Sequence, residues 1–104
     1  MKVERSADIA KKSVNVEGAK GVEIRVLISK DDGAPTFAMR MFEVQPSGHT
    51  PLHRHPHEHE VFVLEGAGLV VCEGKNYPIT REDVVFVPGG SVLRFLCLVP
   101  LSGA

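Results

Sequence analysis

Short runs of alternating apolar and polar residues cover most of this chain, and clusters of Gly, Pro, Asp or Ser separate the runs. This pattern is typical of half-buried β-strands. No segment shows a sustained helical periodicity. Strands at this spacing predict an all-β barrel or sandwich, with the polar first 21 residues as an arm or an edge strand. The expected strands cover residues 22–30, 36–45, 60–65, 69–73, 77–80, 83–87 and 92–99.

Two glycine-rich stretches mark the sharpest expected turns. The Gly-Ala-Gly stretch at 66–68 is expected to reverse the chain in a tight turn, because glycine tolerates a positive φ. The Pro-Gly-Gly-Ser stretch at 88–91 interrupts the chain again before its last strand. Both stretches are therefore expected to separate successive strands.

The composition fits one domain over residues 1–104, with enough chain for a hydrophobic core. The formal net charge is −1, from 12 basic and 13 acidic residues, so nothing indicates a nucleic-acid or anionic-membrane partner. The longest apolar runs are only of strand length, and residues 1–5 lack the apolar stretch of a signal peptide. We therefore expect a soluble, cytoplasmic protein. Cys72 and Cys97 lie in apolar runs and are expected to be buried thiols.

All five histidines of the chain lie between residues 49 and 59. The run is internal, interrupted by Pro, Arg and Glu, and continues directly into an apolar strand, so it does not resemble an expression tag. Neutral imidazole is the commonest nitrogen ligand of divalent transition metals in proteins. The cluster therefore predicts a metal site.

The spacing of the histidines favours three of them as ligands. His53 and His55 are two residues apart, so on an extended strand both leave the same face, with Cβ atoms about 7 Å apart. After the interruption at Pro56, His59 shares its parity with two valines that are expected to face inward. His57, at the bend, and His49, in a glycine-led turn, are weaker candidates. Glu60 is out of phase with His59 and is expected to face solvent or an interface.

The stretch from Gly48 to Gly66 resembles the first conserved motif of the cupin superfamily. In that motif a glycine precedes a His-x-His pair, an acidic residue comes three or four positions later, and a second glycine closes the pattern. Here histidine replaces the acidic residue, as in some small single-domain cupins. The resemblance implies a cupin-type double-stranded β-helix, a jelly-roll barrel over residues 22–101, preceded by an arm over residues 1–21. It also implies that one Mn, Fe, Ni, Cu or Zn ion is held by His53, His55 and His59.

The second cupin motif is incomplete in this chain. In the family, a Pro-x-Gly turn precedes a fourth ligand histidine, but there is no histidine after His59. By comparison with the family, about ten residues are absent between the strands at 83–87 and 92–99, including the strand that would carry this ligand.

The short link at 88–91 also conflicts with the family's usual topology, in which the strands that it joins are parallel. A parallel return needs about a dozen residues, whereas four residues span at most about 14 Å and a strand is about 17–20 Å long. Four explanations fit this conflict: the last strand reverses, it swaps into a neighbouring chain, the sequence lacks a loop that the molecule has, or the link is an engineered shortcut. We favour the last two. The C-terminal part is therefore expected to be truncated or swapped relative to the family.

With three protein ligands, the metal would keep one face open to solvent or substrate, as in catalytic sites. Cys97 is a candidate replacement ligand, but a small buried side chain is its favoured interpretation, and we expect water on the metal. Arg40 is a second catalytic candidate, since an inward arginine could anchor an anionic substrate; an outward arginine paired with Glu43 or Glu60 is equally supported. The resemblance implies a cavity lined by Val61, Val63, Phe95, Cys97 and Val99.

These observations favour a metal-binding cupin, dioxygenase-like in its chemistry, that acts on a small and fairly apolar organic substrate. The alternative is a non-catalytic module that binds a metal or ligand, or a barrel with a structural metal. Phe62 and Leu64 are out of phase with the inward valines and would expose apolar surface. Small cupins commonly dimerise through such a face, so we expect a homodimer.

Overall fold

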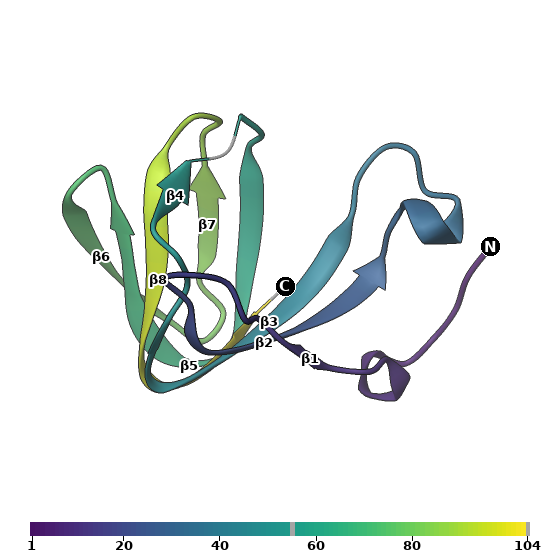
Figure 1. Ribbon diagram of the computed structural model, residues 1–104, viewed down its shortest axis with the longest axis horizontal. Helices are drawn as coiled ribbons and strands as arrows, with labels where there is room; N and C mark the ends of the chain where they lie inside the picture. Colours follow the sequence, from purple (N-terminus) through teal and green to yellow (C-terminus); the bar gives the residue numbers. More distant parts are fainter. Residues whose placement is uncertain (55, 104) are drawn as a thin grey trace.

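The computed structural model describes residues 1–54 and 56–103, and the side chains of all of these except residues 53 and 99–101. The described chain is all-β apart from two short 3-10 turns, η1 and η2 (Figure 1). In chain order the elements are η1 (Ser6–Asp8), β1 (Lys12–Ser13), β2 (Lys20–Ile28), η2 (Lys30–Asp32), β3 (Met39–His49), β4 (His53–Arg54), β5 (His59–Cys72), β6 (Lys75–Thr80), β7 (Val84–Val87) and β8 (Val92–Gly103). None of the described helical turns is long and apolar enough to cross a membrane.

The strands form a jelly-roll barrel, which confirms the predicted fold class. The main sheet has the order β1-β2-β3-β8-β5-β6, with β4 paired to β8 and β7 paired to β5. Every pair is antiparallel. The expected arm at the start of the chain includes the edge strand β1, which pairs with Glu23 and Ile24 of β2.

Alternation along the strands builds the core. Val63 is only 2% exposed, and the residues on either side of it in β5 are more exposed. The same period of two holds in β7, where Val87 is buried while Val84 and Phe86 are exposed. The buried cluster inside the barrel comprises Val22, Val44, Val63, Val70, Ile79 and Cys97.

The reversal predicted at residues 66–68 is wrong, because β5 is one continuous strand of 14 residues. Gly66 does have a positive φ of 91°, as a turn would require. Its effect is a bend rather than a turn: the register between β5 and β8 shifts at several points between Val63 and Gly68. Extra residues in one strand increase its local bending, so the glycines let β5 curve around the barrel.

This curvature also resolves the problem of the short link at 88–91. β7 ends at Val87, opposite His59 at the start of β5, whereas β8 starts beside Cys72 at the end of β5. Because β5 curves, both of its ends lie at the same end of the barrel, and a four-residue link suffices (Figure 1). The last strand therefore reverses relative to β7, which is the first of the four explanations, and β8 pairs within its own chain.

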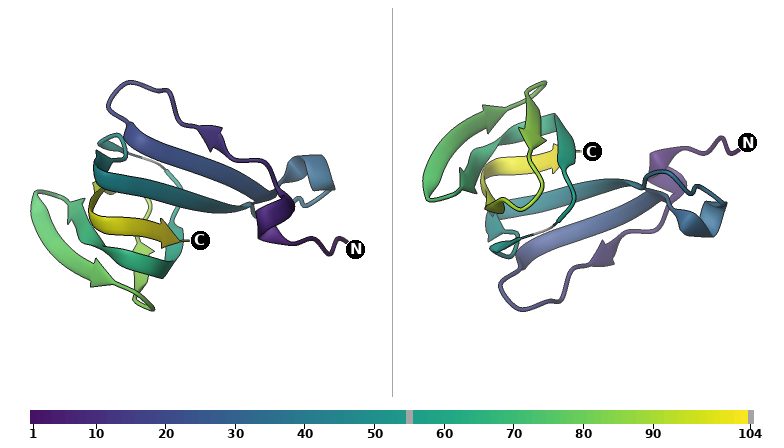
Figure 2. Two further views of the ribbon diagram at one scale, coloured as in Figure 1. Left: turned by 90° about the horizontal axis from the view of Figure 1, so that it is seen from below. Right: turned by 90° about the horizontal axis from the view of Figure 1, so that it is seen from above.

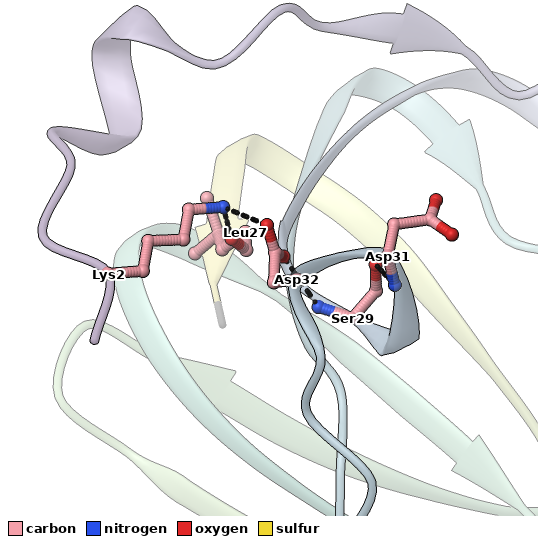
Figure 3. A network of polar contacts seen from close by, with 5 residues as sticks. All are labelled: Lys2, Leu27, Ser29, Asp31 and Asp32. Carbon is pink, nitrogen blue, oxygen red and sulfur yellow. Dashed lines mark hydrogen bonds and ion pairs between the residues drawn. The ribbon is translucent and has the colours of Figure 1, made fainter.

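The β2–β3 hairpin extends beyond the barrel (Figure 2). The pairing of β3 with β8 ends at Phe42, opposite Gly103, so the hairpin beyond this point is two-stranded. Its tip is closed by polar contacts (Figure 3): the Asp32 carboxylate accepts a hydrogen bond from the Ser29 amide at 3.0 Å and from Lys2 Nζ at 2.9 Å. Lys2 also donates to the carbonyl of Leu27 at 2.9 Å, which ties the N-terminal segment to the hairpin.

Candidate metal centre

Two of the three predicted ligand positions lie at the same end of the barrel. Residue 53 pairs with Leu93, near the start of β8, and His59 pairs with Val87, at the end of β7. Leu93 and Val87 are both buried. The link 88–91 joins these two pairs directly, so residues 53 and 59 flank one short connection although five residues lie between them in the chain.

His59 lies on the inner face of the barrel. Residues directly opposite each other in an antiparallel pair point to the same face, and Val87 opposite His59 is buried. His59 is itself half-buried, and its Nε2 atom is shielded from solvent. The structure thus places His59 as the alternation with Val61 and Val63 predicted.

The loop between β4 and β5 packs tightly against the link at 88–91. A Cβ atom at Gly89 would lie 2.5 Å from the carbonyl oxygen of Pro56 and 3.5 Å from the carbonyl carbon of His57. No side chain larger than hydrogen fits there without movement of the backbone. The Pro-Gly-Gly-Ser pattern predicted only a link, so this role of Gly89 beside the histidines was missed from the sequence.

The start of the histidine-rich segment is held to β8 through Thr50. Its amide donates to the carbonyl of Phe95 at 3.0 Å, and its hydroxyl Oγ1 accepts from the Phe95 amide at 2.9 Å. These two bonds fix the backbone where β3 gives way to the loop before β4. β8 therefore holds the chain at Thr50, before residue 53, and again at residue 53 itself, which pairs with Leu93.

His55 and the side chain of His53 lie outside the described part of the chain. Among the side chains that are described, no three of His, Cys, Asp and Glu gather closely enough to hold a metal. The donor set itself suits the ions that the sequence predicted, because imidazole nitrogen binds Mn, Fe, Ni, Cu and Zn.

The two weaker histidine candidates lie elsewhere. His57 is exposed. His49 pairs with Leu96, which alternates with the buried Cys97, so His49 is on the outer face of the barrel wall. Its Nδ1 atom is buried and has no hydrogen-bond partner among the described residues. His49 and His59 therefore lie on opposite faces of the wall.

Glu60 is exposed, as its parity predicted. A hydrogen bond that the protonated Glu60 carboxyl donates to the Glu58 carboxylate raises the pKa of Glu60, and the negative charge of Glu58 raises it further. The shared hydrogen bond stabilises a protonated form of the pair, because two carboxylates side by side repel each other. The outer side of the strand that carries His59 is therefore acidic.

Arg40 lies outside the barrel interior. It is exposed and pairs with Val26 beyond the last β3–β8 pair, so the structure does not bring it to the histidines. The expected partner Glu43 instead binds Lys11 at 3.3 Å and Arg25 at 3.5 Å.

The predicted cavity wall is closely packed where it is described. Val63 and Cys97 belong to the buried cluster, and Phe95 packs against it; Val61 is half-buried, and the side chain of Val99 lies outside the described part. Neither Cys72 nor Cys97 is in a disulfide; the first is half-buried and the second buried. A surface hollow of about 330 Å³ lies elsewhere, between β1, β2 and Gln45.

The cupin domain family matches residues 40–98 of this chain, which include the histidine segment, β5, β7 and most of β8. The chain belongs to the cupin family. The chain therefore departs from the usual cupin pattern in two features, the missing second-motif histidine and the short link at 88–91.

Three relatives show the range of proteins that this cupin resembles. It is 37% identical to an oxalate-binding protein of Thermotoga maritima, over 85% of this chain and 76% of that protein. It is 36% identical to the 1-methylthio-D-xylulose 5-phosphate methylsulfurylase of Rhodospirillum rubrum, over 62% of this chain but only 47% of that protein, so it spans about half the length of this relative. The structure of the polyketide cyclase RemF from Streptomyces resistomycificus superposes with a TM-score of 0.89 and 34% identity, over 99% of this chain and 74% of that one.

Proposed function

We propose that this cupin holds one divalent transition metal through His53, His55 and His59 and acts on a small organic molecule. The placement of His59 carries the proposal. Its ring lies on the inner face with a shielded Nε2, and residue 53 is held at the same end of the barrel through Leu93. Cupins commonly bind metals, which agrees with this donor set.

The rest of this end of the barrel would position and shield the metal. When bound, the metal would supply Lewis acidity to an oxygen-donor substrate or, as Mn or Fe, the redox capacity of a dioxygenase-like reaction. Val87 and Leu93 keep water from the inner side of the ligand strands, since both are buried. Gly89 lets the link pack against the histidine loop, and the Thr50–Phe95 bonds fix the start of that loop.

The substrate class is inferred from the open metal face and the apolar wall. Val61, Val63 and Phe95 offer no charged group, so the wall favours a fairly apolar molecule that reaches the metal through one oxygen donor. The oxalate and sugar phosphate in the names of two relatives are oxygen-rich organic molecules, which supports an oxygen donor. Cys72 and Cys97 are not joined in a disulfide, which suits a reducing cytoplasmic compartment.

A second candidate function is ligand binding without catalysis. The relative named as an oxalate-binding protein favours it, since the match covers 76% of that protein's length. In this case the metal would hold a small acid by coordination, and no bond of the ligand would change. The two candidates share the metal site and differ only in whether the bound molecule reacts.

Metal content tests the shared site. Purified protein, stripped with a chelator and reloaded with Mn, Fe, Ni, Cu or Zn, should retain about one equivalent of ion. Replacing His53, His55 and His59 together by alanine should abolish retention and leave a folded protein. His57→Ala and His49→Ala are matched controls, which should keep the metal. Stoichiometric metal in the triple variant would refute the site.

Oxalate is the probe that separates the two functions. Calorimetry should show binding of oxalate to the metal-loaded protein and none to the triple variant if the metal binds small acids. Release of carbon dioxide or uptake of O₂ on the same samples would indicate catalysis. Tight oxalate binding with neither signal would favour the binding module.

A further inference from the structure

Two arginines lie side by side on the outer face of the barrel wall, behind the candidate metal centre. Leu93 of β8 is buried, so Val92 and Arg94, which flank it in the strand, face outward. Arg54 of β4 is directly opposite Val92 and therefore shares the outer face. Arg94 comes two residues after Val92, so it is a diagonal neighbour of Arg54, at a separation that long side chains can bridge.

His49 extends this arrangement along the same face. It is paired with Leu96, which follows Arg94 by two residues on β8, so His49 and Arg94 are diagonal neighbours as well. Along β8, Arg94 therefore lies between Arg54 and His49. We call these three side chains the outer basic row.

Two nitrogens of the outer basic row are shielded from solvent without a hydrogen-bond partner among the described residues. They are Nε of Arg94 and Nδ1 of His49, and both side chains are half-buried. Buried polar groups in native proteins nearly always have a partner, because an unsatisfied one costs free energy. Two such groups at neighbouring positions of one face indicate a place where an acceptor from outside the chain binds.

The outer basic row also lacks a compensating negative charge. Neither Arg54 nor Arg94 forms an ion pair with any residue that the structure describes. The carboxylate of Glu73, at the end of β5, accepts the Val92 amide at 2.9 Å and is not paired with an arginine. An anion would therefore meet two unpaired guanidinium groups, one of them in half-buried surroundings where charges attract more strongly than in open water.

We propose that the outer basic row binds a phosphate group, either as inorganic phosphate or as part of a small phosphate monoester. Arginine recognises phosphate oxygens through its planar fork of donors, and a tetrahedral phosphate offers acceptor oxygens in several directions at once. Arg94 holds the group at its centre, and Arg54 and His49 donate from its two sides. A planar carboxylate, with two oxygens, fits three donors spread along a strand less well. The site is on the opposite face of the wall from His59 and does not depend on the proposed metal function.

Calorimetric titration with inorganic phosphate and with methyl phosphate tests this site, before and after a chelator removes the metal. We expect a Kd of about 1 mM in both states, because the row is outside the barrel. Arg94→Gln should weaken binding about tenfold or more, and so should Arg94→Lys, which keeps the charge but loses the fork. Arg54→Gln, at an exposed position, should weaken it without affecting the fold. Arg40→Gln removes another exposed arginine and is the matched control. The phosphate form that binds more tightly identifies the source of the group.

Metal analysis on the same samples separates this site from the metal centre. His49→Ala should weaken phosphate binding about fivefold and keep the metal. The triple variant of His53, His55 and His59 should lose the metal and keep phosphate binding. Loss of phosphate binding on chelation or in the triple variant would place the anion on the metal and overturn the proposal. So would unchanged binding in Arg94→Gln, or oxalate binding to the metal-free protein as tight as that of phosphate.

Discussion

The barrel and the hairpin are built from the same alternating pattern, but their side chains meet different surroundings. In the barrel, β5 is paired on both edges and its inner residues, such as Val63, are buried by the same chain. In the hairpin, the same face continues as Val26, which is 44% exposed. Periodicity therefore tells which residues share a face, whereas burial depends on what the fold places opposite that face.

Glycine substitution gives the largest expected difference between the two regions. Gly89→Ala puts a Cβ 2.5 Å from the Pro56 carbonyl oxygen, a backbone atom, so the histidine loop or the link must move. We expect a loss of about 3 kcal/mol in the free energy of unfolding and weaker metal retention. The measurement is denaturant unfolding combined with metal analysis.

Gly33, at the hairpin tip, is the matched control. A Cβ there would meet no atom within 4 Å, and only its φ of 80° disfavours alanine. Gly33→Ala should cost about 1 kcal/mol and leave the metal unchanged. Equal effects at both glycines would show that the link does not hold the histidine loop.

Valine truncation gives a smaller contrast. Val63→Ala removes methyl groups from the best-buried side chain of the barrel and should cost about 2 kcal/mol. Val26→Ala, in the part of the β2–β3 hairpin beyond the barrel, should change the free energy of unfolding by less than about 0.5 kcal/mol, because Val26 is 44% exposed. Both variants are measured by denaturant unfolding at the same protein concentration. An effect of Val26→Ala as large as that of Val63→Ala would contradict the contrast between the two regions.

The smallest expected effect lies at the tip of the hairpin. The hydrogen bond from Lys2 and that from the Ser29 amide lower the pKa of Asp32. The lowered pKa means that Asp32 contributes stability above its unfolded pKa, and that this contribution is lost as the pH falls through its folded pKa. Lys2→Ala should move the Asp32 pKa upward, towards its usual value, as measured by NMR titration of the carboxyl group. An unchanged titration would show that Lys2 does not contact Asp32 in solution.

The sequence predicted the fold from two independent signals, the strand period and the histidine motif. The period placed His59 with Val61 and Val63 correctly, because alternation is a local property of an extended chain. The strand pattern failed at residues 66–68, because glycines fit a bend within one strand as well as a reversal between two strands. Only the pairing of β8 along β5 distinguishes these two cases. The curvature of β5 also made the direction of the last strand unpredictable from the length of the link.

The remaining site residues depended on long-range contacts. Arg40 alternates in phase with the core residues Phe42 and Val44. At Arg40, however, β3 is no longer paired with β8, so a residue on this side of the strand is exposed there. His49 is separated from the inner histidines by its pairing with Leu96, which a linear motif does not reveal. The metal assignment to His53, His55 and His59 stays a prediction.

X-ray absorption at the edge of the bound metal tests the central claim most directly. Wild-type protein reloaded with zinc should show three imidazole nitrogens and solvent oxygen at about 2.0–2.1 Å, and His59→Ala should lose one imidazole. Cys97→Ser should leave the spectrum unchanged. A sulfur scatterer at about 2.3 Å that vanishes in Cys97→Ser, or an imidazole count that His59→Ala does not alter, would contradict the account.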